Sequence, residues 1–250
     1  MVALITGASS GMGRDMACIL DKKGYDLILV ARRLDKLEEL KQELKNDVTL
    51  ISMDLSIIEN CYQLYEQVKD RNIDIIINNA GFGLLGNFVS SDLDRELNMV
   101  DLNIKALHIL TKLFLNDFVS KDHGYILNVA SSAAFQPGPL MATYYATKAY
   151  VLHLTEAIYE ELRHMKSHVY IGCLCPGPVN TEFNQVANVT FSLKGLDSYQ
   201  VSQYAINKMF ARKRIIVPGI LMKLNVCFNR FLPKKLLLQC TYYIQRRKDR

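Results

Sequence analysis

The sequence predicts an α/β fold of the doubly wound, three-layer kind, with a mostly parallel seven-stranded sheet. Two observations lead to this prediction. Short apolar runs alternate with amphipathic stretches along most of the 250 residues, and nearly all of these runs are continuous Val, Ile and Leu. Strands of that composition are buried on both faces, which is typical of a parallel sheet covered by helices. A chain of this length can bury one large core.

The expected strands and helices follow one another in alternation. Seven strands are expected, at residues 2–6, 27–31, 48–53, 73–78, 125–130, 169–175 and 214–217. Helical spacing of apolar residues indicates six helices, at residues 13–23, 34–44, 57–71, 92–120, 144–165 and 198–210. Such repetition gives right-handed crossovers. We therefore assign residues 1–218 to one domain and residues 219–250 to a basic, amphipathic helical extension of the same domain.

The composition is that of an ordinary globular protein, with 50% hydrophobic and 22% charged residues. No stretch reaches the roughly 18 to 20 apolar residues of a membrane span, and the opening lacks the pattern of a secretory signal. The six cysteines lack metal-ligand spacing. Cys173 and Cys175 are expected to be reduced thiols on one face of a strand. These features predict a cytoplasmic protein without a metal.

The first strand is followed by a glycine-rich turn, Thr-Gly-Ala-Ser-Ser-Gly-Met-Gly, at residues 6–13. Glycines at such a turn let the backbone approach a pyrophosphate at the positive end of a helix. The spacing is G-x-x-x-G-x-G rather than the G-x-G-x-x-G of the general dinucleotide fingerprint. Its place after an opening apolar strand predicts a nucleotide site made by Gly7, Ser9, Ser10, Gly11, Met12 and Gly13.

The end of the second strand indicates which nucleotide binds. NAD-binding proteins usually place an acid there to hold the ribose 2′-hydroxyl. Here the strand ends at Arg32 and Arg33, and no acid follows until Asp35. A guanidinium suits a 2′-phosphate, which an acid would repel. The cofactor prediction is therefore NADP(H), although a solvated arginine pair at a helix start is the alternative.

A further pattern, Tyr144-x-x-x-Lys148, follows the fifth strand. Together with the glycine turn and the Asn-Asn-Ala-Gly segment at residues 78–81, it resembles the short-chain dehydrogenase/reductase family in its simple, single-domain form. The resemblance covers residues 2–181. It implies a Rossmann-type fold and an NADP(H)-dependent enzyme acting on CH–OH or C=O groups. It also implies a catalytic tetrad of Asn103, Ser131, Tyr144 and Lys148.

The spacing of this tetrad fits proton transfer. Tyr144 and Lys148 lie one helical turn apart on one face. The Lys148 ammonium and a positive nicotinamide would favour phenolate, so we expect the pKa of Tyr144 to fall by about 2–3 units. Ser131 would hydrogen-bond the substrate oxygen where negative charge grows. For the position of Asn103 the resemblance implies a water-mediated proton path through Lys148, although a capping or bridging role is the alternative.

Two of these assignments have a neighbouring competitor. Tyr145 lies three residues before Lys148, so spacing alone does not exclude it, and the family pattern favours Tyr144. Ser132 competes with Ser131, which the family's usual separation of thirteen residues before the tyrosine favours.

The resemblance adds further cofactor contacts: Asp54, Leu55, Asn79, Ala80, Gly81, Pro176, Gly177, Val179 and Thr181. Asp54 resembles the family's adenine contact, with a capping role as the alternative. Asn79 is expected to tie strands together, with the next two residues against the adenosine ribose. The segment from Pro176 to Thr181 resembles a mobile loop that closes on the nicotinamide carboxamide. Tyr144 and Lys148 also face the cofactor.

The segments that read substrate in this family are apolar here. They contain Phe82, Leu84, Leu85, Phe135, Pro137, Leu140, Met141, Phe183, Phe191, Leu193 and Leu196. We expect a hydrophobic carbonyl or alcohol substrate, such as a keto-acyl, steroid-like or other ketone compound. The alternative is that several of these side chains only pack the core.

The last 39 residues are strongly basic. Residues 212–250 hold eleven Lys/Arg and one acid, a charge of +10, so the remainder carries −5. A first predicted helix groups Ile220, Leu224, Cys227, Phe228 and Phe231, and a second, at 234–247, groups Leu236, Leu237, Cys240 and Tyr243. These helices either dock on the domain or a sister subunit, or contact a membrane peripherally. Nucleic acid is not an expected partner, because no binding module accompanies the charge.

Other functions compete with hydride transfer. A non-catalytic NADP(H)-binding regulatory or membrane-peripheral protein would need no tetrad. A sugar-nucleotide epimerase shares the Tyr-x-x-x-Lys pattern but usually has another glycine spacing and a larger C-terminal domain. The resemblance also implies a homodimer or homotetramer formed through the helices at 92–120 and 144–165, surfaces that the tail could cover.

Overall fold

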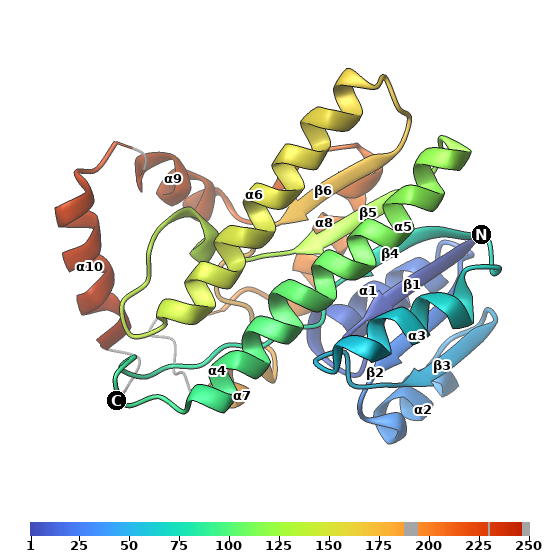
Figure 1. The fold of residues 1–250 in the computed structure, drawn as a ribbon, viewed down its shortest axis with the longest axis horizontal. Coiled ribbons are helices and arrows are strands. Elements are labelled where there is room, and N and C mark those ends of the chain that lie inside the picture. The colour runs from blue at the N-terminus through green and yellow to red at the C-terminus, as the bar shows by residue number, and fades with distance from the viewer. Residues whose placement is uncertain (188–194, 230, 247–250) are drawn as a thin grey trace.

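The computed structural model describes residues 1–187, 195–229 and 231–246. A parallel sheet lies between two layers of helices (Figure 1). Its strands are β1 (Val2–Thr6), β2 (Asp26–Ala31), β3 (Val48–Ser52), β4 (Ile73–Asn78), β5 (Tyr125–Val129), β6 (Tyr170–Leu174) and β7 (Ile215–Ile216). The order in the sheet is β3-β2-β1-β4-β5-β6-β7, and every neighbouring pair is parallel. The predicted doubly wound fold is confirmed.

The helices agree with the predicted ones apart from their ends. They are α1 (Gly11–Asp21), α2 (Leu34–Glu43), α3 (Ile58–Val68), α4 (Leu93–Val100), α5 (Leu107–Lys121), α6 (Ala142–His164), α7 (Phe183–Val186), α8 (Ser198–Phe210), α9 (Ile220–Asn229) and α10 (Lys234–Arg246). The short helix α7 and a 3-10 turn, η2 (Ser132–Phe135), were not predicted. Each is only one turn long, and an element of that length carries no measurable apolar period.

The helix expected over residues 92–120 is interrupted. A π-helical segment, η1 (Asp101–Ala106), separates α4 from α5. A π turn contains one residue more than an α turn, and such turns are frequent at functional sites. The apolar pattern on either side stays helical, so no pattern in the sequence indicates this local change.

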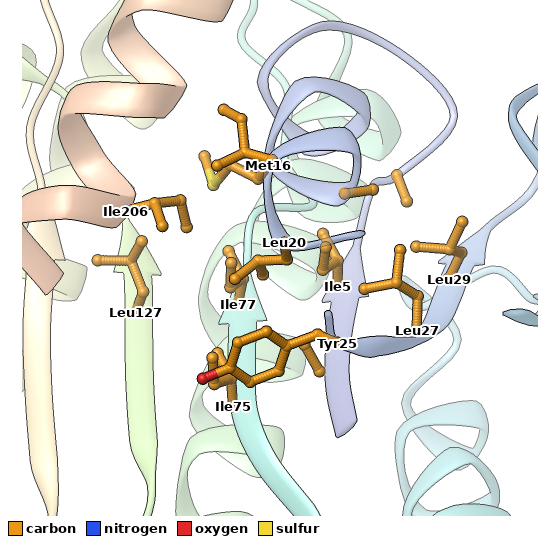
Figure 2. Packing of buried hydrophobic residues seen from close by; sticks show 14 of the residues in the cluster. Ile5, Met16, Leu20, Tyr25, Leu27, Leu29, Ile75, Ile77, Leu127 and Ile206 are labelled. Atoms are coloured by element: carbon orange, nitrogen blue, oxygen red, sulfur yellow. The ribbon is translucent and has the colours of Figure 1, made fainter. Parts of the chain in front are cut away.

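Alternation along the strands divides the core into two layers. In β1, Leu4 packs with α3 and α5, whereas Ile5 packs with α1 and α8. Figure 2 shows the second layer, where Ile5 and Ile77 of the sheet lie against Met16 of α1. All of these side chains are fully buried, and burial of one such side chain contributes about 1.5–3 kcal/mol.

The order of the strands fixes where a ligand can bind. From β1, the chain continues to one side through β2 and β3, and to the other side through β4, β5 and β6. In open sheets of this kind, ligands bind beyond the carboxyl ends of the strands where the order reverses. That point is the pair β1 and β4, which are followed by the glycine turn and by Asn79–Gly81.

Helices α9 and α10 lie at the end of the molecule where α6 begins, away from the N-terminus (Figure 1). The second helix, α10, is tied to the domain: Thr241 accepts a hydrogen bond from Gln136 at 3.1 Å, and Gln245 donates to Tyr145 of α6. Its buried side chains are Leu237, Thr241 and Gln245. Three of the four residues of the predicted apolar face, Leu236, Cys240 and Tyr243, are exposed, so that face does not dock on the domain.

The first tail helix, α9, leaves most of its apolar side chains exposed. Its buried side chain is Val226, whereas the predicted apolar face, including Ile220, Leu224 and Phe228, is 61–75% exposed. The expectation that such a face docks on the domain is not met. Arg230 and residues 247–250 of the tail lie outside the described residues.

Candidate active site

A cavity of about 610 Å³ lies beyond the carboxyl ends of the strands. The residues that follow β1, β2, β3, β4, β5 and β6 all contribute to its wall, together with Tyr144 and Lys148 of α6. Every residue of the predicted cofactor set lines the cavity except Gly13, and so does Ser131. Gly13 and Asn103 lie behind the wall and shape it indirectly.

The glycine turn leaves no space for larger residues. Gly7 has φ +65°, and a Cβ there would lie 2.9 Å from the Ala80 Cα. At Gly13, a Cβ would lie 2.3 Å from the Gly7 carbonyl oxygen. The turn therefore brings bare backbone and the start of α1 to the cavity. Ser10 does not cap that helix, so the first N–H groups face the cavity, as a pyrophosphate site requires.

The two arginines after β2 both line the cavity, as predicted, but they have different partners. Arg32 is exposed, and its guanidinium lies 3.6 Å from the Asp54 carboxylate. The guanidinium of Arg33 donates to the Ser9 hydroxyl at 3.2 Å and to the Glu182 carboxylate at 2.7 Å. Glu182 was not singled out from the sequence, because it is distant in the chain and belongs to no motif.

Asp54 occupies the end of β3 beside Leu55. Its carboxylate accepts hydrogen bonds from the backbone N–H and the hydroxyl of Ser56, at 2.9 and 2.8 Å. Burial raises the pKa of Asp54, but these hydrogen bonds and the Arg32 charge outweigh it, so the pKa is lowered. Asp54 therefore forms a local turn before α3, whose N-cap is Ile57, so the alternative capping role is wrong, and Asp54 lines the cavity.

The predicted proton donor lies at the inner end of the cavity. The hydroxyl of Tyr144 lies close enough to the Ser131 side chain for that side chain to lower the pKa of the phenol, and the Ser131 hydroxyl accepts the Ala133 N–H at 3.1 Å. One turn further along α6, the Lys148 ammonium lies 5.9 Å from the Tyr144 ring centre and donates to the Val129 carbonyl at 2.9 Å. The structure thus brings Ser131, Tyr144 and Lys148 together.

The expected lowering of the tyrosine pKa is wrong for the protein chain by itself. Burial raises the pKa of Tyr144 to about 12, and the Ser131 side chain offsets only part of this effect. Burial also lowers the pKa of Lys148 to about 8. Both shifts have one cause, because removal of water disfavours the phenolate and the ammonium alike.

Asn103 sits in the π-helical segment η1 and is buried. Its side chain forms a pair of hydrogen bonds with the backbone of Phe82, at 3.1 and 2.9 Å, and donates to Thr147 at 3.1 Å. A Cβ on Gly81 would lie 2.8 Å from the Asn103 oxygen and 3.4 Å from the Lys148 nitrogen. Asn103 therefore connects three parts of the chain: η1, the segment that follows β4, and helix α6. This is the structural bridge that was given as its alternative role.

Both competing residues, Tyr145 and Ser132, also line the cavity, so only their contacts distinguish them from Tyr144 and Ser131. The hydroxyl of Tyr145 accepts a hydrogen bond from Gln245 of α10, away from Lys148. Ser132 begins the 3-10 turn, and its backbone N–H donates to the Pro176 carbonyl at 2.7 Å. The geometry thus favours Tyr144 over Tyr145, and Ser131 over Ser132.

Asparagines at the ends of the central strands have structural roles. Asn79 donates to the carbonyl oxygens of Thr6 and Gly7 at 3.1 and 3.2 Å, which ties β4 to β1. Asn78 donates to Asn128 and to Thr111, at 2.9 and 3.0 Å. The network around Asn78 was not predicted. A signal was present, since Asn78 and Asn128 end two apolar strands and pair in the sheet.

The segment after β6 covers one side of the cavity. Val179 forms a bridge with Leu196, and a Cβ on Gly11 would lie 2.9 Å from the Thr181 methyl group. A Cβ on Gly177 would collide with Met222 of α9. The loop therefore contacts the glycine turn on one side and the tail on the other.

The expected substrate residues divide into several groups. Phe82, Met141 and Phe183 line the cavity, and the Phe183 ring lies 5.5 Å from the Tyr144 ring. Leu84 and Leu85 pack beside them in one apolar cluster. Phe135 and Pro137 line a second cavity of about 480 Å³ between α6 and α10, whereas Leu140 lines neither. Phe191 and Leu193 lie outside the described residues.

The wall is less apolar than predicted, because Arg95 and Asn98 of α4 also line the main cavity. Their spacing with Leu102, another wall residue, places them on one helical face. That spacing was visible in the sequence, but no polar lining was expected there.

The fold and the site define a dinucleotide-binding α/β oxidoreductase. Residues 1–190 match the model of the short chain dehydrogenase family. The chain belongs to that family, which confirms the resemblance.

Individual relatives agree with this assignment. An uncharacterized oxidoreductase of Staphylococcus epidermidis is 33% identical over 187 residues, 74% of this chain and 80% of the relative. A short-chain dehydrogenase from Sphingobium yanoikuyae in complex with NADPH has a TM-score of 0.83 and 28% identity, covering 92% of this chain and 93% of that one. A bulky-bulky ketone specific alcohol dehydrogenase from Comamonas testosteroni has a TM-score of 0.79 and 27% identity, covering 92% of each chain.

The described part of the chain has neither a candidate metal cluster nor a helix that could span a membrane. Within residues 1–187, 195–229 and 231–246, no group of three or more His, Cys, Asp or Glu side chains is placed to hold a metal ion. Over the same residues, no helix has the length and hydropathy needed to cross a bilayer.

Proposed function

We propose that the protein is an NADP(H)-dependent oxidoreductase that interconverts a hydrophobic ketone and its alcohol. The observation that carries the proposal is the buried contact between Tyr144 and Ser131 in a cavity continuous with the glycine turn. A protein that only bound a nucleotide would have no need of a buried proton donor beside an apolar wall.

The side chains divide the chemistry between them. Tyr144 gives a proton to the substrate oxygen in reduction and takes it back in oxidation. Ser131 orients the same oxygen by a hydrogen bond. Lys148 carries a charge beside the tyrosine and, held at the Val129 carbonyl, is directed to the cofactor side of the wall. The nicotinamide, when bound, supplies or accepts the hydride.

Asn103 would act through its neighbours. Its hydrogen bonds with Phe82 and Thr147 fix the distance between η1 and α6, and therefore hold Lys148 beside Tyr144. We propose that this position supports proton exchange through Lys148.

The preference for NADP(H) rests on Arg32 and Arg33. Both guanidinium groups line the cavity beyond β2, where a 2′-phosphate would lie. The relative from Sphingobium yanoikuyae, which has the same fold, holds NADPH. The backbone of the glycine turn would receive the pyrophosphate, Asp54 and Leu55 the adenine, and Ala80 and Gly81 the ribose.

A hydrophobic substrate fits the wall near the proton donor. Phe82, Met141 and Phe183 lie there, and the Comamonas testosteroni relative is specific for bulky-bulky ketones. The deciding experiment is a panel of ketones and alcohols assayed with NADPH and with NADH. We expect NADPH absorbance to decay with bulky ketones, and no turnover of any member would overturn the proposal.

We further propose that the protein is cytoplasmic and touches a membrane peripherally through α9. Helix α9 exposes Ile220, Leu221, Leu224 and Phe228, at 61–84%, within a tail of net charge +10. An apolar ridge in a basic segment suits an anionic lipid surface. A second copy of the chain would bring a like charge to the same place.

We also propose one domain with a helical extension, and assembly into a homodimer or homotetramer. Residues 219–250 extend the domain 1–218, since Gln245 and Thr241 anchor α10 to it. A homodimer or homotetramer through the helices at 92–120 and 144–165 remains compatible with the fold, and light scattering measures it directly.

A further inference from the structure

The guanidinium that the NADP(H) proposal depends on is already engaged by the protein. One nitrogen of Arg33, Nη2, donates to the Glu182 carboxylate at 2.7 Å and to the Ser9 hydroxyl at 3.2 Å. Arg33, Ser9 and Glu182 all line the cavity. A carboxylate thus holds the donor that a 2′-phosphate would use.

Glu182 reaches this position from the segment after β6, 149 residues further along the chain. Its carboxylate is also hydrogen-bonded to the Ser10 side chain, and the hydrogen bond from Arg33 is the main reason why its pKa is lowered. Glu182 is therefore anionic at neutral pH. It ties the segment after β6 to the glycine turn and to the end of β2.

The contact is open to exchange. The side chains of Arg33 and Glu182 are 45% and 47% exposed, so water or a ligand can replace either partner at small cost. The neighbouring cationic side chains form ion pairs with other carboxylates: Arg32 lies near Asp54, and Lys36 pairs with Glu39. Competition for a phosphate therefore centres on Arg33.

We propose that Glu182 determines cofactor selectivity by competing with the 2′-phosphate of NADP(H) for Arg33, an inference that rests on the proposed NADP(H) site. Two anions a few ångströms apart repel each other, even around a shared guanidinium. Binding of the phosphorylated cofactor displaces Glu182. The unphosphorylated cofactor leaves the contact intact and the segment after β6 tied to the glycine turn.

The competition between Glu182 and the 2′-phosphate can be tested by binding of two adenine nucleotides, with no need for an enzymatic reaction. Adenosine 2′,5′-bisphosphate carries the 2′-phosphate, and adenosine 5′-monophosphate lacks it. Calorimetric titration of the full chain is carried out with the wild type, with Glu182→Gln, and with the control Glu39→Gln, which removes a somewhat more exposed acid from α2 (62% against 47%). Glutamine keeps the shape of the side chain while removing its charge.

We expect Glu182→Gln to bind the bisphosphate about two- to fivefold more tightly, the range that an exposed ion pair allows, and the monophosphate within about twofold of the wild type. The control should match the wild type for both ligands. Unchanged or weaker bisphosphate binding in Glu182→Gln would overturn the inference, since it would mean that the carboxylate of Glu182 does not weaken binding of the 2′-phosphate.

Measurements in a variant that lacks Arg33 distinguish failure of this inference from failure of the proposed NADP(H) preference. In Arg33→Gln, the added change Glu182→Gln should have no effect on bisphosphate binding, because the shared partner is gone. An equal gain in that background would show a general charge effect and overturn the competition. If the wild type binds both nucleotides equally and Arg33→Gln changes neither, the NADP(H) preference fails instead.

Discussion

The hydroxyl of Tyr145 accepts a hydrogen bond from the side-chain amide of Gln245, a residue 100 positions further along the chain. The adjacent Tyr144 turns to Ser131 instead. The two neighbouring tyrosines thus have different roles: Tyr144 takes part in the proposed reaction, and Tyr145 helps to attach the tail. This division gives a direct test of the proposed proton donor.

Replacement of Tyr144 by Phe should lower kcat/KM for ketone reduction by about 10²–10⁴-fold, because the proton donor is lost. Tyr145→Phe should retain most of the activity and lose about 1–3 kcal/mol of stability, because the buried Gln245 amide loses its partner. Steady-state kinetics and denaturant unfolding measure the two effects. Equal losses of activity in both variants would refute the assignment.

Replacement of Arg33 by Gln should raise the KM for NADPH by about tenfold, since a charge-assisted hydrogen bond contributes about 1.5–3 kcal/mol. The KM for NADH should stay within about twofold. Arg32→Gln should have a smaller effect, because that side chain is more exposed and lies near Asp54. A uniform rise for both cofactors would contradict a phosphate contact.

The buried ammonium predicts a dependence of stability on pH. Burial lowers the pKa of Lys148 to about 8, against about 10.4 when unfolded. Between these values the unfolded state binds more protons, so this group makes stability rise with pH. Lys148→Met should be more stable than the wild type at pH 7, by up to about 3 kcal/mol. The gap should close as the pH approaches 10.

Denaturant unfolding at pH 7 and at pH 9.5 measures that gap. Lys112→Met, which alters a lysine on the outer side of α5, is the control and should show no such change. A gap of constant size for Lys148→Met would mean that its ammonium stays solvated.

The asparagine network between the central strands predicts a loss of stability. Asn78→Ala removes hydrogen bonds to Asn128 and Thr111 and leaves their buried atoms without those partners. The free energy of unfolding should fall by about 1–3 kcal/mol. Asn87→Ala, in an exposed loop, should stay within about 0.5 kcal/mol of the wild type. A neutral Asn78→Ala would show that the network does not stabilise the sheet.

The exposed ridge on α9 predicts binding to anionic vesicles. Leu224→Ser combined with Phe228→Ser should reduce co-sedimentation with phosphatidylserine-containing vesicles several-fold, because the apolar contact is lost. Phe88→Ser with Val89→Ser, which are at least as exposed elsewhere, at 66% and 99%, is the control. This pair is preferable to truncation at 234, which would remove Gln245 from Tyr145. Identical binding by all three proteins would exclude the α9 contact.

The sequence was sufficient for the seven strands and the long helices, but not for α7, the 3-10 turn or the π-helical segment η1. Continuous apolar runs indicate buried strands whatever their neighbours, and the glycine turn has few conformations open to it. The family resemblance indicated Ser131, Tyr144 and Lys148, and the spacing placed Tyr144 and Lys148 on one face of a helix, where local geometry fixes direction.

Contacts between distant segments were beyond the sequence. The pairing of Arg33 with Glu182, the attachment of Gln245 to Tyr145 and the outward face of α9 all depend on which loops meet in space, and a periodic pattern carries no such information. The sign of the Tyr144 pKa shift was missed for a related reason. Spacing places an ammonium nearby, but only the packed structure determines how much water both groups lose, and that loss exceeds their mutual attraction.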